Sequence, residues 1–140
     1  MRALGIDLGE RRIGVALSSG SVASPLQTLQ RSSDHSTDHR RILEIVSEWE
    51  VDTLVVGLPL SLDGSEGPAA VSVRLEIAEL AAATSISVVP YDERFTTVTA
   101  ARLLKAGSVP GRSQRQMVDQ VAAAVMLQAW LDGRADTPDS

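Results

Sequence analysis

The chain has 140 residues, 44% of them apolar, and a formal net charge of −5. That length suits one domain that buries a core of its own. The chain contains no cysteine, which excludes disulfides, thiolate metal sites and cysteine nucleophiles. Its longest apolar stretch, Val121–Leu127, is far short of the roughly 20 residues that span a bilayer. We therefore expect a cytoplasmic protein with no membrane partner.

The negative charge speaks mildly against a nucleic-acid partner, because phosphate binding normally goes with a basic surface. Part of that charge lies at residues 132–140, which hold three aspartates and one arginine. We expect one domain over residues 1–132 and a disordered acidic tail over 133–140. All but one of the 13 cationic side chains are arginines, whose planar group suits bidentate phosphate contact.

Hydrophobic patterning predicts strands and helices in a definite order. Short Gly and Ser breaks separate three strands that suit hairpins, Ala3–Gly9, Arg12–Ser18 and Val22–Leu29. Apolar spacing, continuous apolar runs and turn residues then predict, in order, a helix over 37–50, a strand over 51–58, a helix over 68–83, a strand over 86–91 and helices over 97–106 and 113–131. Alternating strands and helices in the second part imply parallel pairing there. The expected fold is an α/β domain with a mixed five-stranded sheet and helices on both faces.

Asp7 is the first candidate site residue, because it stands in the first strand between residues with small side chains or none. A carboxylate in a buried strand is unfavourable unless it is paired or binds a metal. The flanking glycines leave room for something other than protein to approach. Two interpretations stay open: Asp7 binds a cation, or it pairs with an arginine such as Arg12 or caps a turn.

The second candidate follows the strand over 86–91, where Asp92 and Glu93 stand in sequence. Ligands of open α/β sheets usually bind at the carboxyl ends of strands. Neighbouring residues of an extended chain point to opposite faces, so only one of the two acids should share a site with Asp7. Asp92 could equally be a turn residue.

Asp119, on the final helix, is the third candidate site residue. It shares a helix face with Ala122, Ala123 and Met126, and the alanines allow that helix to lie close to the sheet. Asp119 therefore either caps a buried group or faces a metal. Three carboxylates from distant parts of the chain suit Mg²⁺, with Mn²⁺ as a substitute. By contrast, His35 and His39 lack a third ligand with suitable spacing, and we expect them to be solvated at a helix start.

Four segments together resemble the YqgF/RuvX family over nearly the whole chain. They are GIDLGERRIGVA (5–16), VVGLPLSLDG (55–64), DERFTTVTA (92–100) and VDQVAAAVMLQAWL (118–131). The resemblance implies an RNase H-like fold with sheet order 3-2-1-4-5. It also implies a metal-dependent nuclease that processes the precursor of 16S ribosomal RNA. Asp7, Glu93 and Asp119 match the family's catalytic, metal-binding acids.

The resemblance also implies substrate-binding residues, for which we take Arg12, Arg94, Thr96, Thr97 and Arg115. Basic residues commonly precede the last aspartate in the family. Here Arg115 is followed by Gln116, Met117 and Val118, so one cation typical of the family is missing, which leaves the strength of substrate binding open but does not affect the expected metal site. Expected partners are pre-rRNA, branched DNA and a ribosomal precursor particle. Recognition beyond a one-domain footprint would require a homodimer or another protein.

Three alternative functions remain at this point. The family is also described as Holliday-junction resolvases, which would make four-way DNA junctions the substrate. A non-catalytic assembly factor would bind RNA without cutting it. The Gly-x-Asp-x-Gly hairpin also occurs in ATP-binding proteins of the actin and sugar-kinase type, but those proteins close two such domains around ATP and this chain has length for one.

Overall fold

The computed structural model of the chain describes residues 1–95 and 112–135, with the backbone alone at 95, 112–116 and 135. The helix expected over 97–106 lies outside these described residues, as do residues 136–140. The described elements are β1 (Ala3–Leu8), β2 (Arg12–Ser19), β3 (Val22–Gln30), α1 (His35–Glu48), β4 (Thr53–Leu58), α2 (Pro68–Ala83), β5 (Ser87–Asp92), the 3₁₀ helix η1 (Glu93–Phe95) and α4 (Arg112–Ala135). None of the described helices is long and apolar enough to cross a membrane.

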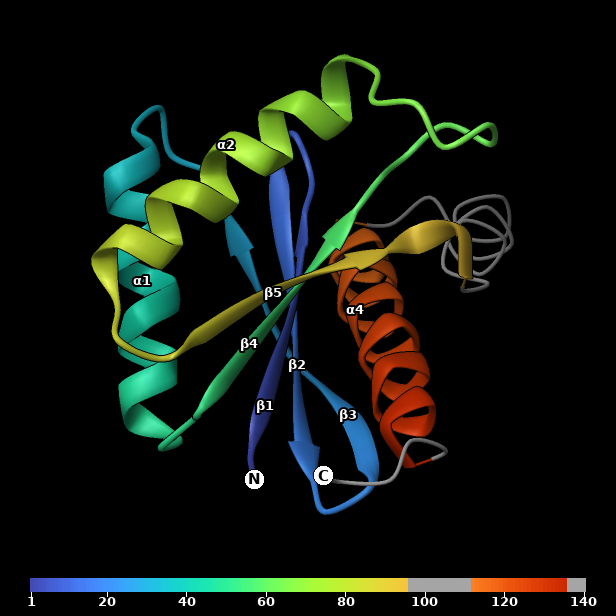
Figure 1. Cartoon of the computed structure of the whole chain (residues 1–140). Helices are drawn as coiled ribbons and strands as arrows, with labels where there is room; N and C mark the ends of the chain where they lie inside the picture. The colour runs from blue at the N-terminus through green and yellow to red at the C-terminus, as the bar shows by residue number, and fades with distance from the viewer. Residues whose placement is uncertain (96–111, 136–140) are drawn as a thin grey trace.

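The five strands form one mixed sheet in the order β3-β2-β1-β4-β5. The first three strands pair antiparallel, whereas β4 pairs parallel with both β1 and β5. Figure 1 shows α1 and α2 on one face of this sheet and α4 on the other. The expected α/β fold, its mixed five-stranded sheet and its strand order are thus confirmed.

The ends of the elements differ from expectation by a few residues. Helix α1 begins at His35 rather than at 37 because Asp34 caps it, accepting the main-chain N–H of Ser36. Strand β4 begins at Thr53 rather than at 51. Helix α4 continues to Ala135, so residues 133–135, which we expected in the tail, are helical. The single turn of η1 was not expected at all.

The two faces of the sheet differ in the size of their side chains. The large residues Leu4 and Ile6 of β1 pack with α1 and α2 in the main core. Their neighbour Ala3 faces α4, together with Ala16 of β2 and Val55 of β4. A methyl group placed on Gly5 would lie 2.9 Å from Cβ of Leu127, closer than such atoms pack. The small residues therefore allow α4 to lie directly on the sheet.

The expectation that His39 is solvated was wrong. His39 is buried, with 4% of its surface exposed, and its Nε2 lies 2.7 Å from Oε1 of Glu76 on α2. This contact could not be predicted from the sequence because Glu76 lies 37 residues away from His39 and on another helix. His35, by contrast, is exposed and lies 3.5 Å from the exposed Glu79.

Glu76 also binds Arg31, which directly follows β3. Nη1 and Nη2 of Arg31 donate to the two carboxylate oxygens at 2.8 and 2.7 Å. Nε of Arg31 donates to the main-chain oxygen of Gly9 at 2.9 Å. Burial acts to raise the pKa of Glu76, but the hydrogen bonds from Arg31 and His39 outweigh it and hold the pKa below its ordinary value. The cluster joins the β1–β2 turn to both helices on this face.

We expect Glu76→Gln to lower the free energy of unfolding by about 3 kcal/mol at pH 7, because it leaves the buried Arg31 charge without its main partner. The loss should shrink at acidic pH. A lowered carboxyl pKa contributes stability above its unfolded value, near 4.5, and that stability is lost as the pH falls through the folded value. Urea unfolding from pH 7 down to pH 3 measures both effects.

Glu79→Gln is the matched control, because Glu79 lies on the same helix with about half of its side chain exposed. It should change stability by less than about 0.5 kcal/mol at every pH. A Glu76→Gln effect that is equally small, or that is constant with pH, would contradict the role given to this cluster.

Candidate functional site

Asp7 lies near the carboxyl end of β1 with a glycine beside it on each neighbouring strand. In β2 its register partner is Gly14. In β4 the pairing of Ile6 with Val56 continues to place Gly57 beside Asp7. Alternation from Ala3 puts Asp7 on the α4 face of the sheet, where only 7% of its surface is exposed. The carboxylate thus stands between two positions that have no side chain.

Asp119 approaches the same place from α4. A methyl group placed on Gly14 would overlap the main-chain oxygen of Asp119, so this turn of α4 lies directly over Gly14. Since Gly14 is the register partner of Asp7, the two aspartates are neighbours across the helix–sheet contact. Oδ2 of Asp119 accepts a hydrogen bond from Nε of Arg12 at 2.6 Å. The Asp119 side chain is 14% exposed.

Glu93 reaches the site from the other side. It opens η1 directly after β5, and its Oε1 would lie 2.7 Å from a methyl group placed on Gly57. The carboxylate is therefore packed over the glycine that lies beside Asp7. Burial, with a smaller contribution from the charge of Asp92, raises the pKa of Glu93 above its ordinary value. The expectation that only one of the two consecutive acids shares a site with Asp7 fits this arrangement.

The three acids therefore gather at one place on the α4 face, but their carboxylates do not form a ready metal site. Within residues 1–95 and 112–135, no group of three or more His, Asp or Glu side chains is placed to hold a metal ion. Arg12 already binds Oδ2 of Asp119, and clustered carboxylates in general repel one another when no cation lies between them. The donor chemistry, three carboxylates brought close by Gly14 and Gly57, nevertheless fits a hard divalent cation.

Asp92 and Arg94 form a pair of their own beside Glu93. Arg94 donates to Asp92 through Nε at 3.1 and 3.0 Å and through Nη2 at 2.6 Å. Its Nη1 also donates to the main-chain oxygen of Leu62 at 3.3 Å. Hydrogen bonds from Arg94 lower the pKa of Asp92. Asp92 therefore shapes the turn that carries Glu93, and Arg94 links that turn to the loop after β4.

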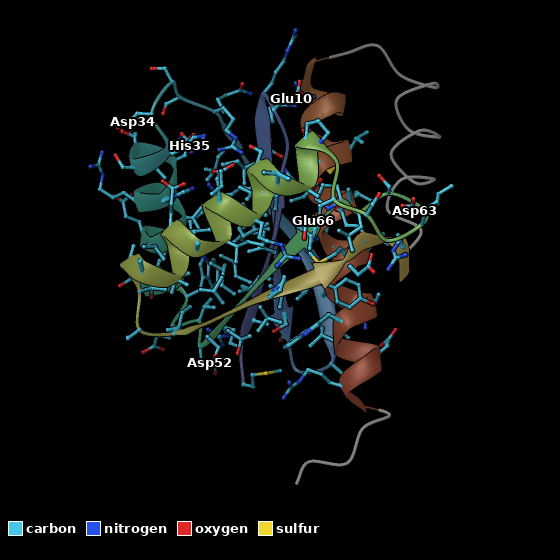
Figure 2. The ribbon with its side chains drawn as sticks, turned by 45° about the horizontal axis from the view of Figure 1, so that its top comes forward. Glu10, Asp34, His35, Asp52, Asp63 and Glu66 are labelled. Atoms are coloured by element: carbon cyan, nitrogen blue, oxygen red, sulfur yellow. The ribbon has the colours of Figure 1, made fainter. Side chains whose placement is uncertain are left out.

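The surroundings of the site carry acids as well as arginines. Figure 2 shows Glu10 near the top of the molecule, beside the turn between the first two strands, and Asp63 and Glu66 on the loop before α2. Glu66 is paired with Arg74 at 3.0 Å. Of the residues expected to bind substrate, Arg12 and Arg94 both pair with acids of the chain, and Thr96, Thr97 and the Arg115 side chain lie outside the described residues.

A cavity of about 470 Å³ opens on the opposite face of the sheet. It is lined by the β1–β2 turn, the loop after β4 and the start of α2, with Arg31 and Glu76 at its polar side. None of the three candidate acids lines it. The polar groups of this cavity, Arg31 and Glu76, already bind each other.

The sequence pointed to the three acids as candidates but not to the glycines that surround them. Gly14 and Gly57 were visible as small residues in buried strands, the usual sign of close backbone approach. Their significance depends on strand register, which places both beside Asp7. The ion pair between Arg12 and Asp119 was not predicted either: pairing of Arg12 with Asp7 was one of the alternatives left open, and the structure shows Arg12 bonded to Asp119.

Comparison with known proteins gives consistent matches along the chain. Residues 1–133 match the family described as "RuvX: Holliday junction resolvase". A protein of Anaeromyxobacter sp. (strain Fw109-5) named "Putative pre-16S rRNA nuclease" is 46% identical over 136 residues, which is 96% of this chain and 98% of the relative. A protein of the same name from Rhodococcus opacus (strain B4) is 45% identical and covers 96% of this chain, with 79% of the relative covered.

Among solved structures, Thermus thermophilus RuvC in complex with a Holliday junction substrate resembles this chain with a TM-score of 0.61. The two share 19% sequence identity over 98% of this chain and 97% of the other. At that identity the likeness shows a common fold.

Substitutions at the two glycines should separate packing from site geometry. Gly57→Ala meets the far end of a flexible side chain, so we expect a stability change below about 0.5 kcal/mol but a displaced Glu93 carboxylate. The pKa of Glu93 should then fall toward its ordinary value, as measured by carboxyl NMR titration in EDTA.

Gly14→Ala places a methyl group against the backbone of α4 and should lower the free energy of unfolding by about 1–3 kcal/mol, as measured in urea. An unchanged Glu93 pKa in the first variant, or wild-type stability in the second, would contradict this geometry.

Proposed function

Because the chain belongs to the RuvX family, we propose that it is a nuclease that hydrolyses phosphodiester bonds with the help of Mg²⁺ or Mn²⁺ held by Asp7, Glu93 and Asp119. The observation that carries this proposal is the packing around Asp7. Asp119 lies over the glycine on one side of it and Glu93 over the glycine on the other.

Each acid contributes a different property to the proposed site. Asp7 is fixed within a paired strand, so its carboxylate has little freedom to reorient. Glu93 is desolvated, which makes its charged form gain more from a nearby cation than an exposed carboxylate would. Asp119 sits on a helix turn that is fixed by contact with Gly14. A bound divalent cation would supply Lewis-acid stabilisation of the phosphate and activation of the attacking water.

The proposed substrate is the precursor of 16S ribosomal RNA, in the cytoplasm. The names of the two relatives support RNA as the substrate, because each match covers most of the length of that relative. A four-way DNA junction is the second candidate, favoured by the description of the family. The ribosomal precursor particle and a homodimer remain proposals for how a small acidic domain gains enough contact with RNA.

The proposal predicts that purified protein cuts a 16S precursor RNA only when Mg²⁺ or Mn²⁺ is added. Asp7→Asn, Glu93→Gln and Asp119→Asn should each reduce the single-turnover rate by about a thousandfold or more, because each removes a charged ligand without changing size. Asp132→Asn is the control, since Asp132 lies on the same helix as Asp119 but is exposed and binds Gln128. It should cut at the wild-type rate.

Parallel assays on a four-way DNA junction and with metal omitted distinguish the alternatives. Cutting of the junction but not of the RNA would move the substrate assignment to branched DNA. Tight RNA binding without cutting, with or without metal, would instead identify a non-catalytic assembly factor. Wild-type cleavage by any of the three variants would remove that residue from the proposed site.

A further inference from the structure

Arg12 stands at the start of β2 and reaches across to α4. It lies on the same strand face as Gly14, two residues further on. Its Nε donates to Oδ2 of Asp119 at 2.6 Å, which is short for a charge-assisted hydrogen bond. A positive group of the chain therefore already occupies one oxygen of a carboxylate that the proposed function assigns to a cation.

Both ends of this ion pair are held in place by the backbone. The main-chain oxygen of Arg12 accepts the N–H of Gly9 at 3.0 Å and closes the turn before β2. At the other end, the main chain of Asp119 rests on Gly14. The pair thus joins two fixed points that lie 107 residues apart in the sequence.

The environment makes this ion pair stronger than one on the open surface. The side chains of Arg12 and Asp119 are 27% and 14% exposed, so water and salt screen the attraction only in part. The guanidinium also lies beside a site where carboxylates would otherwise repel each other. A cation that binds Asp119 through Oδ2 must therefore displace or share this hydrogen bond.

Resting on the proposed function, we infer that Arg12 is a positioning residue whose guanidinium competes with a divalent cation for the Asp119 carboxylate. In the metal-free protein Arg12 holds Asp119 in place and neutralises it. When a cation binds, Asp119 exchanges one positive partner for another. This role differs from the phosphate contact that sequence analysis assigned to Arg12.

The test measures Mn²⁺ affinity in the absence of nucleic acid, by electron paramagnetic resonance at fixed, low ionic strength. Arg12→Gln should bind Mn²⁺ about threefold to tenfold more tightly than wild type, because the competing group is gone. Arg12→Lys keeps the charge and should stay within about twofold of wild type. Arg11→Gln makes the same change of charge one residue away, at an exposed side chain, and should also stay within about twofold.

A second measurement needs no variant. The Nε–H of Arg12 should change its NMR chemical shift when Mg²⁺ is titrated into the wild-type protein, because its hydrogen bond to Asp119 is weakened. The Nε–H of Arg31, which is bonded to Gly9 on the opposite face, serves as the internal reference and should not shift. Urea unfolding of Arg12→Gln reports any loss of stability separately.

Each outcome decides the inference. Unchanged or weaker Mn²⁺ binding by folded Arg12→Gln, or an Arg12 Nε–H signal that Mg²⁺ does not move, overturns it. An Arg12→Gln variant with a raised KM for RNA and unchanged metal affinity also overturns it and returns Arg12 to phosphate binding. If the wild-type protein neither binds Mn²⁺ nor cuts RNA in the presence of metal, the proposed function fails as well. If the wild-type protein cuts RNA with metal but Arg12→Gln binds Mn²⁺ as the wild type does, only the role of Arg12 is overturned.

Discussion

The close approach of α4 and η1 to the sheet is the constraint on which the candidate site depends. Approach at this distance is possible only where the strands carry no side chain. Gly14 meets the main chain of Asp119, and Gly57 meets the carboxylate of Glu93. Strand register then places both glycines beside Asp7. Three acids that are far apart in the sequence can lie close together because side chains are missing at two points, and the Arg12–Asp119 ion pair adds an attraction between β2 and α4.

Charge pairing is the second theme of the structure. Like charges gathered at one place would destabilise the fold unless positive groups compensate them. Around the site, Arg12 pairs with Asp119 and Arg94 pairs with Asp92. Arg12 and Arg94, two of the arginines expected to bind substrate, are therefore engaged within the chain. This explains how an acidic domain tolerates a site of this kind, and why net charge was a poor guide to its chemistry.

Local patterns in the sequence predicted most of the fold, because alternation and helical spacing report directly on burial. They also placed Asp7 on a strand face and Asp119 on an inward helix stripe. Strand order did not follow from these patterns and came from the family resemblance. Contacts between distant side chains were beyond prediction: the partner of Arg12 depends on how α4 sits on β2, and the burial of His39 depends on Glu76 of another helix. Such pairings depend on tertiary packing, which produces no periodic pattern in the sequence.

The turn that follows Asp7 is anchored by hydrogen bonds at both main-chain polar atoms of Gly9. Arg31, held by Glu76 on the α2 side, binds the oxygen of Gly9, while the nitrogen of Gly9 binds the oxygen of Arg12. The chain therefore cannot fray at the point where the first acid is presented. The conformational entropy of this turn is lost during folding, so it is not reduced again when a ligand binds. Preorganisation of this kind would allow helices on the far side of the sheet to favour binding at the proposed site without touching it.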